Sequence, residues 1–180
     1  GWIGLFGAGD FAHSLLILYA TSRLSLTHGL EGATRIAVAL YLLHNVVYAT
    51  ATYPAGWLAD RLSKQRLLVV AYFLGAAVGA LLATGWSSLP LLAVAFGAGG
   101  LYVGMEETLE DSLTAEAIPE AQRGAAFGLL AIVNGAGDFF SSILTGWLWA
   151  WFGPGAAFGV AALLMAAGAS GLARRRPSRI

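Results

Sequence analysis

Long apolar stretches alternate with short polar breaks along the whole chain. A helix that crosses a bilayer needs about 20 mostly apolar residues. Six stretches meet that length, at residues 2–22, 34–58, 66–84, 89–112, 123–149 and 155–173. The breaks carry turn-forming residues such as Gly29, Pro119 and the pair Gly153-Pro154. The pattern predicts an all-α integral membrane protein in which residues 1–180 form a single bundle of six transmembrane helices.

Composition strengthens this interpretation. Apolar residues make up 58% of the chain and charged residues 11%, whereas an ordinary soluble domain has about 25% charged residues. The net charge is zero and there is no cysteine, so we expect no nucleic-acid partner, no disulfide and no thiolate metal site. Small-residue spacings such as Gly75-x-x-x-Gly79 predict close packing between helices in the lipid bilayer.

The distribution of basic residues predicts the orientation. If both ends lie on one side of the membrane, that side receives eight of the ten Lys and Arg residues, and Arg23 and Arg35 lie on the other. Cytoplasmic loops are enriched in Lys and Arg. We therefore expect both termini in the cytoplasm of a protein of the plasma membrane. The eight are Arg61, Lys64, Arg66, Arg123, Arg174, Arg175, Arg176 and Arg179.

The connection after the second predicted helix carries a recognisable motif. It reads Gly56-Trp57-Leu58-Ala59-Asp60-Arg61-Leu62-Ser63-Lys64-Gln65-Arg66. This resembles the loop signature of the major facilitator superfamily, with Ser63 in place of the usual glycine and Gln65 in place of a basic residue. The stretch from Ile118 to Gly128 resembles the loop and helix start before the eleventh helix of such transporters. The alternative is an ordinary cytoplasmic loop that matches the motif by chance.

The resemblance implies a fold, a function and a partner. The fold is one half, the C-terminal six helices, of a secondary transporter that moves a small solute by alternating access. The partner is an N-terminal six-helix half, which we expect to be missing from this sequence. The motif residues Gly56, Asp60, Arg61, Lys64 and Arg66 are expected to control conformation. The resemblance also implies that Asp60 pairs with Arg123 as a latch.

Ionisable and amide side chains inside the predicted helices are candidates for the solute path, because such groups are costly in lipid. Asp10 and His13 lie three residues apart on one helix face, where the carboxylate can orient the imidazole. Asn45, next to His44, is a further candidate. The alternative for each is a structural role, as a polar contact that holds helices together.

Two later helices carry the remaining candidates. Glu106 and Glu107 precede Glu110 and Asp111, and carboxylates crowded in this way can hold a proton for coupling. Asn134 and Asp138 lie four residues apart and form a polar stripe. Alternatively, Glu110 and Asp111 lie at the boundary with water, and the polar stripe has the structural role of holding helices together.

Other classes of function fit the residues less well. A six-helix membrane scaffold or a homodimeric half-transporter remains an alternative. An intramembrane protease would use the Ser170 of Gly168-Ala169-Ser170-Gly171, but no histidine follows it to act as the base. His13, His28 and His44 do not cluster at the spacing of metal ligands. We therefore predict a transporter that is not an enzyme and has no cofactor or metal.

Overall fold

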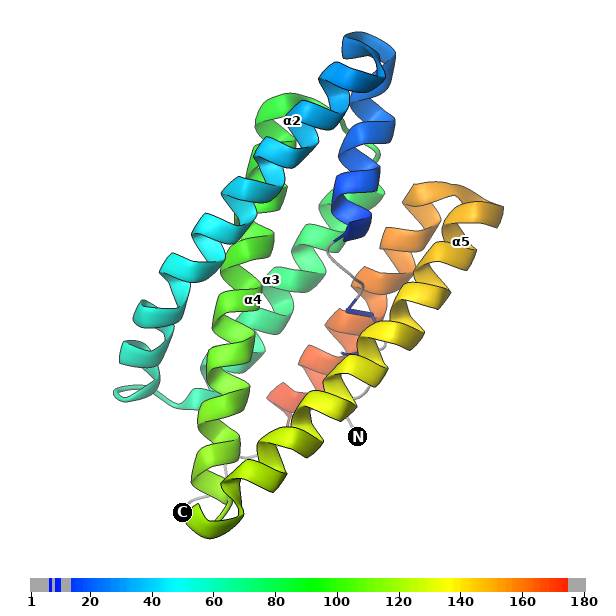
Figure 1. The fold of residues 1–180 in the computed structure, drawn as a ribbon. Coiled ribbons are helices and arrows are strands. Elements are labelled where there is room, and N and C mark those ends of the chain that lie inside the picture. The colour runs from blue at the N-terminus through cyan, green and yellow to red at the C-terminus, as the bar shows by residue number, and fades with distance from the viewer. Residues whose placement is uncertain (1–6, 8, 11–13, 175–180) are drawn as a thin grey trace.

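Helices make up nearly all of the described part of the chain. A computed structural model describes residues 7, 9, 10 and 14–174, which contain no β-strand. The elements, in chain order, are α2 (Ser14–Ala59), α3 (Lys64–Ala83), α4 (Leu89–Ala117), the short 3₁₀ helix η1 (Glu120–Gln122) and α5 (Arg123–Ala173) (Figure 1). The four α-helices are long and apolar enough to cross a membrane. These helices confirm the prediction of an all-α membrane protein.

Two of the helices reverse direction at a glycine. Gly29 in α2 has φ 67° and ψ 169°, and Gly153 in α5 has φ 83° and ψ 170°. This region of backbone space is open to glycine at little steric cost. Pro154 follows the second reversal, where its fixed φ suits a first helical turn. The chain doubles back at both places (Figure 1), so the four helices contain six helical segments.

Small residues bring the segments together. A Cβ atom at Gly100 of α4 would collide with the backbone carbonyl oxygen of His44, and one at Gly104 would lie 2.7 Å from the carbonyl oxygen of Tyr48. The second segment of α2 therefore packs backbone to backbone against α4. On α3, a Cβ at Gly75 would lie 2.6 Å from Met165 Cε, so this helix packs against the second segment of α5.

Apolar side chains fill the bundle in two clusters. In the first, which lies toward the Gly29 and Gly153 reversals, Tyr19 packs edge-to-face on Phe158 with ring centroids 5.2 Å apart. The second cluster lies toward the opposite end of the bundle. Its buried members are Ala59, Leu68, Tyr72, Ala76, Tyr102, Val103, Leu109, Met165, Ala169 and Leu172.

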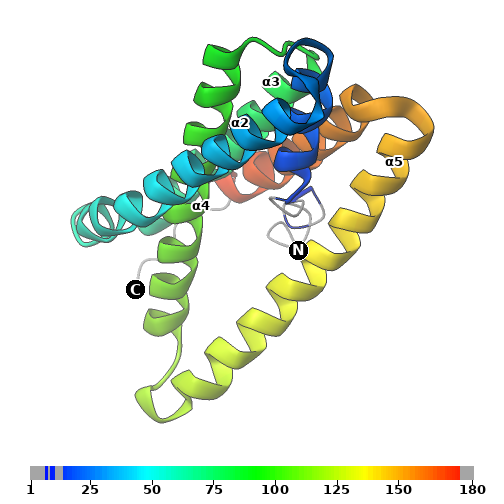
Figure 2. The ribbon, with the colours of Figure 1, turned by 45° about the horizontal axis from the view of Figure 1, so that its top comes forward.

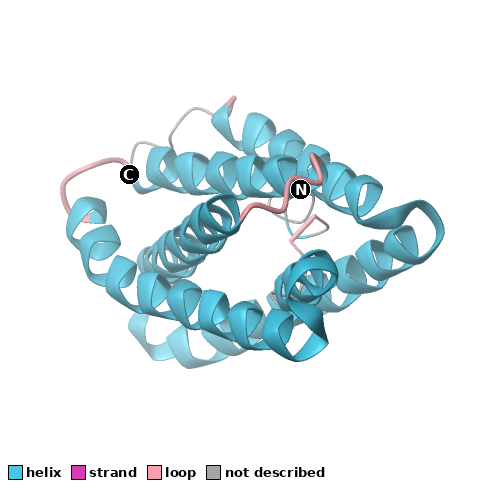
Figure 3. Ribbon diagram, turned by 90° about the horizontal axis from the view of Figure 1, so that it is seen from above, coloured by secondary structure: helices cyan, strands magenta, loops and turns pink. Residues whose placement is uncertain are grey.

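The first segment of α5 lies along the outside of the bundle (Figure 2), and most of residues 123–140 are exposed. Its exposed apolar side chains include Leu129, Ile132, Val133, Phe139 and Phe140. Such a surface suits lipid or other transmembrane helices and not water. The view from above shows only helices and short connections in the described residues (Figure 3).

The basic residues form two groups, one at each end of the bundle. Arg23 and Arg35 belong to the end that contains the Gly29 reversal, and Arg23 Nη2 approaches Gly85 of the α3–α4 turn there. The opposite end contains the α2–α3 loop, η1 and the end of α5. It is held together by a 3.1 Å hydrogen bond from Gln65 Nε2 to the Leu172 carbonyl oxygen. Among the described residues, the basic side chains at this end are those of Arg61, Lys64, Arg66, Arg123 and Arg174.

Candidate functional site

Five carboxylates from different parts of the chain come close to one another. We call this group the acidic cluster, and Glu106 lies near enough to the other four to interact with each electrostatically. No Lys or Arg occurs at residues 67–122 or 124–173, so α4, most of α5 and most of α3 offer no basic side chain to offset it. The members are Asp10, Glu106, Glu107, Glu110 and Asp138.

Tyrosines from three segments donate hydrogen bonds to three of these acids. Tyr102 Oη of α4 lies 2.5 Å from Asp10 Oδ1. Tyr72 Oη of α3 lies 2.6 Å from Glu110 Oε1, and Tyr48 Oη of α2 lies 2.6 Å from Glu107 Oε2. These are neutral donors to acidic groups, so they stabilise the carboxylates without cancelling their charge.

Glu110 joins three helices. Its side chain is on α4 and only 8% of the residue is exposed. One carboxylate oxygen accepts the hydrogen bond from Tyr72 of α3, and the other accepts one of 3.1 Å from Asn134 Nδ2 of α5. The structure therefore brings the predicted site residue Asn134 to the acidic cluster.

One face of α5 turns polar side chains toward the bundle. Asn134, Asp138, Ser141 and Thr145 recur at helical spacing, and Ser141 and Thr145 are buried. Ser141 Oγ donates a hydrogen bond to the backbone carbonyl oxygen of Asp10. Asp138 is exposed, yet its charge acts on Asp10 and Glu106. This stripe supplies the α5 side of the candidate site.

Glu106 is only 9% exposed, and no described residue donates a hydrogen bond to its carboxylate or to that of the exposed Asp138. Glu107, one residue later, is exposed and bonded to Tyr48. Adjacent residues on a helix point about 100° apart. Glu106 therefore faces the interior while Glu107 lies at the side of the helix.

Two predicted candidates fall outside this arrangement. Asn45 is exposed and donates a 2.7 Å hydrogen bond to the Tyr41 carbonyl oxygen of its own helix. His13 lies outside the described residues, so its pairing with Asp10 stays a prediction. His44 is buried, with Nδ1 3.1 Å from the Phe96 carbonyl oxygen and its ring stacked on Tyr41. The contact with Phe96 joins α2 to α4.

The loop motif adopts a different set of contacts from the implied latch. Asp60 and Arg123 are both exposed, and the ion pairs of the described residues do not include one between them. Lys64 instead reaches α4, where its Nζ lies 2.5 Å from Ser112 Oγ and 2.5 Å from Glu116 Oε1.

Of the other motif residues, Gln65 donates a hydrogen bond to the Leu172 carbonyl oxygen of α5. The guanidinium of Arg61 lies 3.8 Å from the ring centroid of Trp57 and donates to its carbonyl oxygen. Gly56 leaves room for the Thr108 side chain, whose Cγ2 would lie 3.8 Å from a Cβ there. Arg66 is exposed.

The tyrosine contacts of the acidic cluster were not predicted from the sequence. Tyr48, Tyr72 and Tyr102 lie within apolar runs and resemble core residues there. Their spacing from the acids along the chain gives no sign of the contact. The one available signal was chemical, because a buried tyrosine hydroxyl needs a hydrogen-bond partner.

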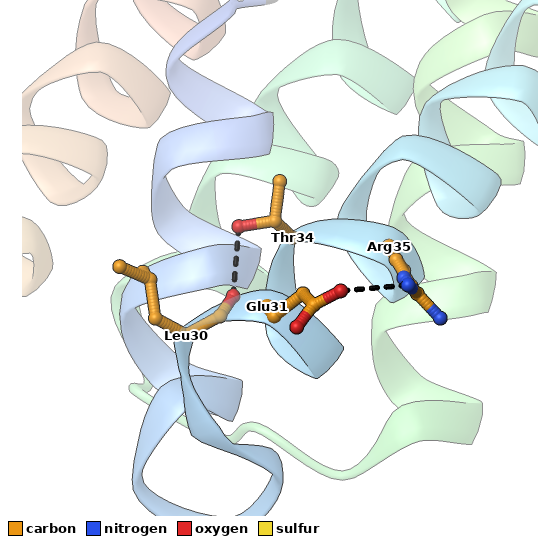
Figure 4. Close-up of polar contacts among 4 residues, drawn as sticks. All are labelled: Leu30, Glu31, Thr34 and Arg35. Atoms are coloured by element: carbon orange, nitrogen blue, oxygen red, sulfur yellow. Dashed lines mark hydrogen bonds and ion pairs between the residues drawn. The ribbon is translucent and has the colours of Figure 1, made fainter.

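A separate depression of about 480 Å³ lies at the start of the second segment of α2. Arg35 Nη2 lies 2.6 Å from Glu31 Oε1, and Thr34 Oγ1 donates to the Leu30 carbonyl oxygen (Figure 4). Val38 completes the lining. Since its two charges neutralise each other and both side chains are highly exposed, this depression is not a candidate site.

A bundle of long apolar helices with buried acids and hydroxyl groups between them defines an integral membrane protein with polar groups in its interior. The family model described as "Major Facilitator Superfamily" matches residues 3–179, and the chain belongs to this family of membrane transporters. It is 30% identical, over 148 residues, to an uncharacterized MFS-type transporter of Methanocaldococcus jannaschii. The match covers 81% of this chain and 36% of that relative. No solved structure matches the chain.

Proposed function

We propose that the chain forms a six-helix half of a secondary transporter that moves a small solute by alternating access. The six helical segments would each cross the bilayer, and a second half would complete the transport path. The chain spans 36% of the length of its relative, which leaves room there for such a second half. We further propose that the second half is an N-terminal one, and that the arrangement is not enzymatic.

The observation that carries this proposal is the hydrogen-bonded contact between Asn134 and Glu110. It joins the polar stripe of α5 to the acids of α4. In a bilayer, polar side chains such as these are tolerated where they line a cavity or contact other protein. Solute paths of secondary transporters lie between two such halves near the middle of the membrane.

The main alternative is a homodimer of this bundle or a scaffold without transport. The exposed first segment of α5 would serve as the interface in a homodimer. A homodimer without transport would bury the polar stripe permanently, whereas a transporter exposes it to water on each cycle.

Single cysteines in the full-length gene product distinguish these possibilities, with any other cysteines removed. Asn134→Cys lies on the polar stripe, and Ile132→Cys is the matched control on the same helix, since Ile132 is 70% exposed and apolar. We expect a membrane-impermeant maleimide to label the Asn134→Cys variant and not the Ile132→Cys variant in proteoliposomes. An Asn134→Cys variant that resists labelling from both sides would exclude an aqueous path along this stripe.

A further inference from the structure

The end of α2 carries two aromatic side chains on its outer surface. Tyr53 and Trp57 lie four residues apart, so they share one face of the helix, and they are 80% and 47% exposed. Trp57 lies close to Ala59, the last residue of α2. In membrane proteins, tryptophan and tyrosine collect at the boundary between hydrocarbon and headgroups, because their rings are apolar and their NH and OH groups are polar. These side chains therefore indicate the level of the headgroups at the end of the bundle that contains the loop motif.

Arg61 folds back onto this aromatic surface. Its guanidinium carbon lies 3.8 Å from the centroid of the Trp57 ring, and its Nη1 donates a 3.1 Å hydrogen bond to the Trp57 carbonyl oxygen. A stacked guanidinium keeps its charge and its outward N–H donors. The neighbouring Asp60 is exposed, and the ion pairs of the described residues do not include Arg61. The stack therefore presents a charge without an acidic partner beside an exposed tryptophan.

The other basic residues of the loop motif are arranged differently. Lys64 is bound to Ser112 and Glu116 of α4, so its charge is used within the bundle. Arg66 is exposed, and the cation–π contacts of the described residues do not include it. Arg61 is therefore the arginine of this motif that an aromatic ring holds at the level of the headgroups.

We propose that the stack of Trp57 and Arg61 binds the phosphate of an anionic phospholipid in the leaflet at this end of the bundle. A guanidinium matches a phosphate with two parallel hydrogen bonds, and stacking on a ring leaves its edge available for them. The exposed ring of Tyr53, one helical turn deeper, would contact the upper acyl chains of that lipid. The inference needs only a protein in a bilayer and is independent of the proposed transport function.

A lipid fits this surface better than a further transmembrane helix does. A helix packed over the stack would remove the guanidinium from water, and a buried charge without a partner is unfavourable. At the end of α2 the same group can reach the water boundary while its stem lies along Trp57. An anionic headgroup lies at that boundary and carries the opposite charge. A soluble phosphate shares this charge but has no chains to contact the aromatic rings.

The test is native mass spectrometry of the purified full-length gene product with phosphatidylglycerol or phosphatidylcholine that have the same acyl chains. We expect the first phosphatidylglycerol to bind with an apparent Kd about fivefold lower, the ratio that one basic group near a membrane surface supplies. Arg61→Gln and Trp57→Leu should each reduce this preference to less than about twofold. Arg61→Lys should restore it only in part, because an ammonium group binds phosphate as a point charge.

The matched control is Arg66→Gln, which removes the same charge from the same loop motif without affecting an aromatic stack, and it should keep most of the preference. Equal losses in Arg61→Gln and Arg66→Gln would overturn the proposal, in favour of a diffuse attraction between loop and lipid. Equal affinities of the unmodified protein for the two lipids would also overturn it, as expected if another helix covers the stack. Displacement of the bound lipid by an equal concentration of glycerol 3-phosphate would identify a soluble phosphate as the ligand instead.

Should Arg61→Gln or Trp57→Leu fail to fold, a second measurement keeps Arg61 intact. Bromine on the acyl chains of a lipid quenches the fluorescence of a tryptophan that the lipid contacts. In vesicles, brominated phosphatidylglycerol should quench more of the protein's fluorescence than brominated phosphatidylcholine, and Trp57→Phe should remove the difference. Equal quenching by the two lipids, or a difference that persists in Trp57→Phe, would overturn the proposal.

Discussion

Lys64 Nζ lies 2.5 Å from Glu116 Oε1, and this ion pair joins the start of α3 to the end of α4. The lysine side chain is 14% exposed and the glutamate side chain 54%. Lys64 also contacts Ser112 Oγ. A half-buried ion pair with a second hydrogen bond is held in one geometry, unlike most surface pairs.

The first prediction is a measurable coupling between these two residues. In a double-mutant cycle of Lys64→Gln and Glu116→Gln, we expect about 1 kcal/mol of coupling. The control cycle uses Arg35 and Glu31, whose side chains are 79% and 82% exposed, and should give about 0.3–0.5 kcal/mol. Reversible unfolding in detergent measures both. Equal coupling in the two cycles would show that Lys64 is an ordinary surface charge.

The second prediction concerns the closest helix contact. Gly100→Ala would place a Cβ against the His44 carbonyl oxygen, which is backbone and cannot rotate away. We expect a loss of about 1–3 kcal/mol in unfolding free energy.

Gly97→Ala is the matched control, because a Cβ there meets nothing within 4 Å and lies on the same helix. Its effect measures the change in helix propensity without a collision, which for Gly to Ala is about 1 kcal/mol in favour of Ala. If Gly100→Ala is as stable as Gly97→Ala, the backbones of α2 and α4 are not in close contact at Gly100.

These contacts show what the sequence could and could not predict. The apolar runs and the positions of Gly29 and Gly153 predict helices and breaks, because hydropathy and turn chemistry are local properties. Which face of α4 points into the bundle is not a local property of the sequence. Its acids at 106, 107, 110 and 111 cover a wide arc of the helix, so only packing decides that Glu106 and Glu110 face inward. For the same reason the tyrosine partners were not predicted.

The latch gives a second example. The resemblance implied that Asp60 pairs with Arg123, since both charges lie at the same end of the bundle. In this structure both are exposed, and Lys64, the first residue of α3, makes an ion pair with Glu116 of α4. Charge positions along a chain identify the end of a bundle but not the partner, because long flexible side chains can reach several groups there.

The third prediction tests Glu110 as a junction of three helices. Tyr72→Phe and Asn134→Ala each remove one hydrogen bond to its carboxylate. We expect each to lower the unfolding free energy by about 1–2 kcal/mol, since bonds to a charged group are stronger than average. The double variant should differ from the sum by at least about 0.5 kcal/mol, because both bonds share one acceptor. Strict additivity would indicate that the two contacts are not made together.

The last prediction is the orientation in the membrane, which the basic residues determine. Arg61, Lys64, Arg66 and Arg123 lie at one end of the bundle, and Arg23 and Arg35 at the other, so we expect the first end in the cytoplasm. Ser88 and Ala121 are exposed and lie at opposite ends. In intact cells an impermeant maleimide should label Ser88→Cys, and it should label Ala121→Cys only after the membrane is permeabilised. The reverse pattern would mean that the loop motif faces outward, where a cytoplasmic latch has no role.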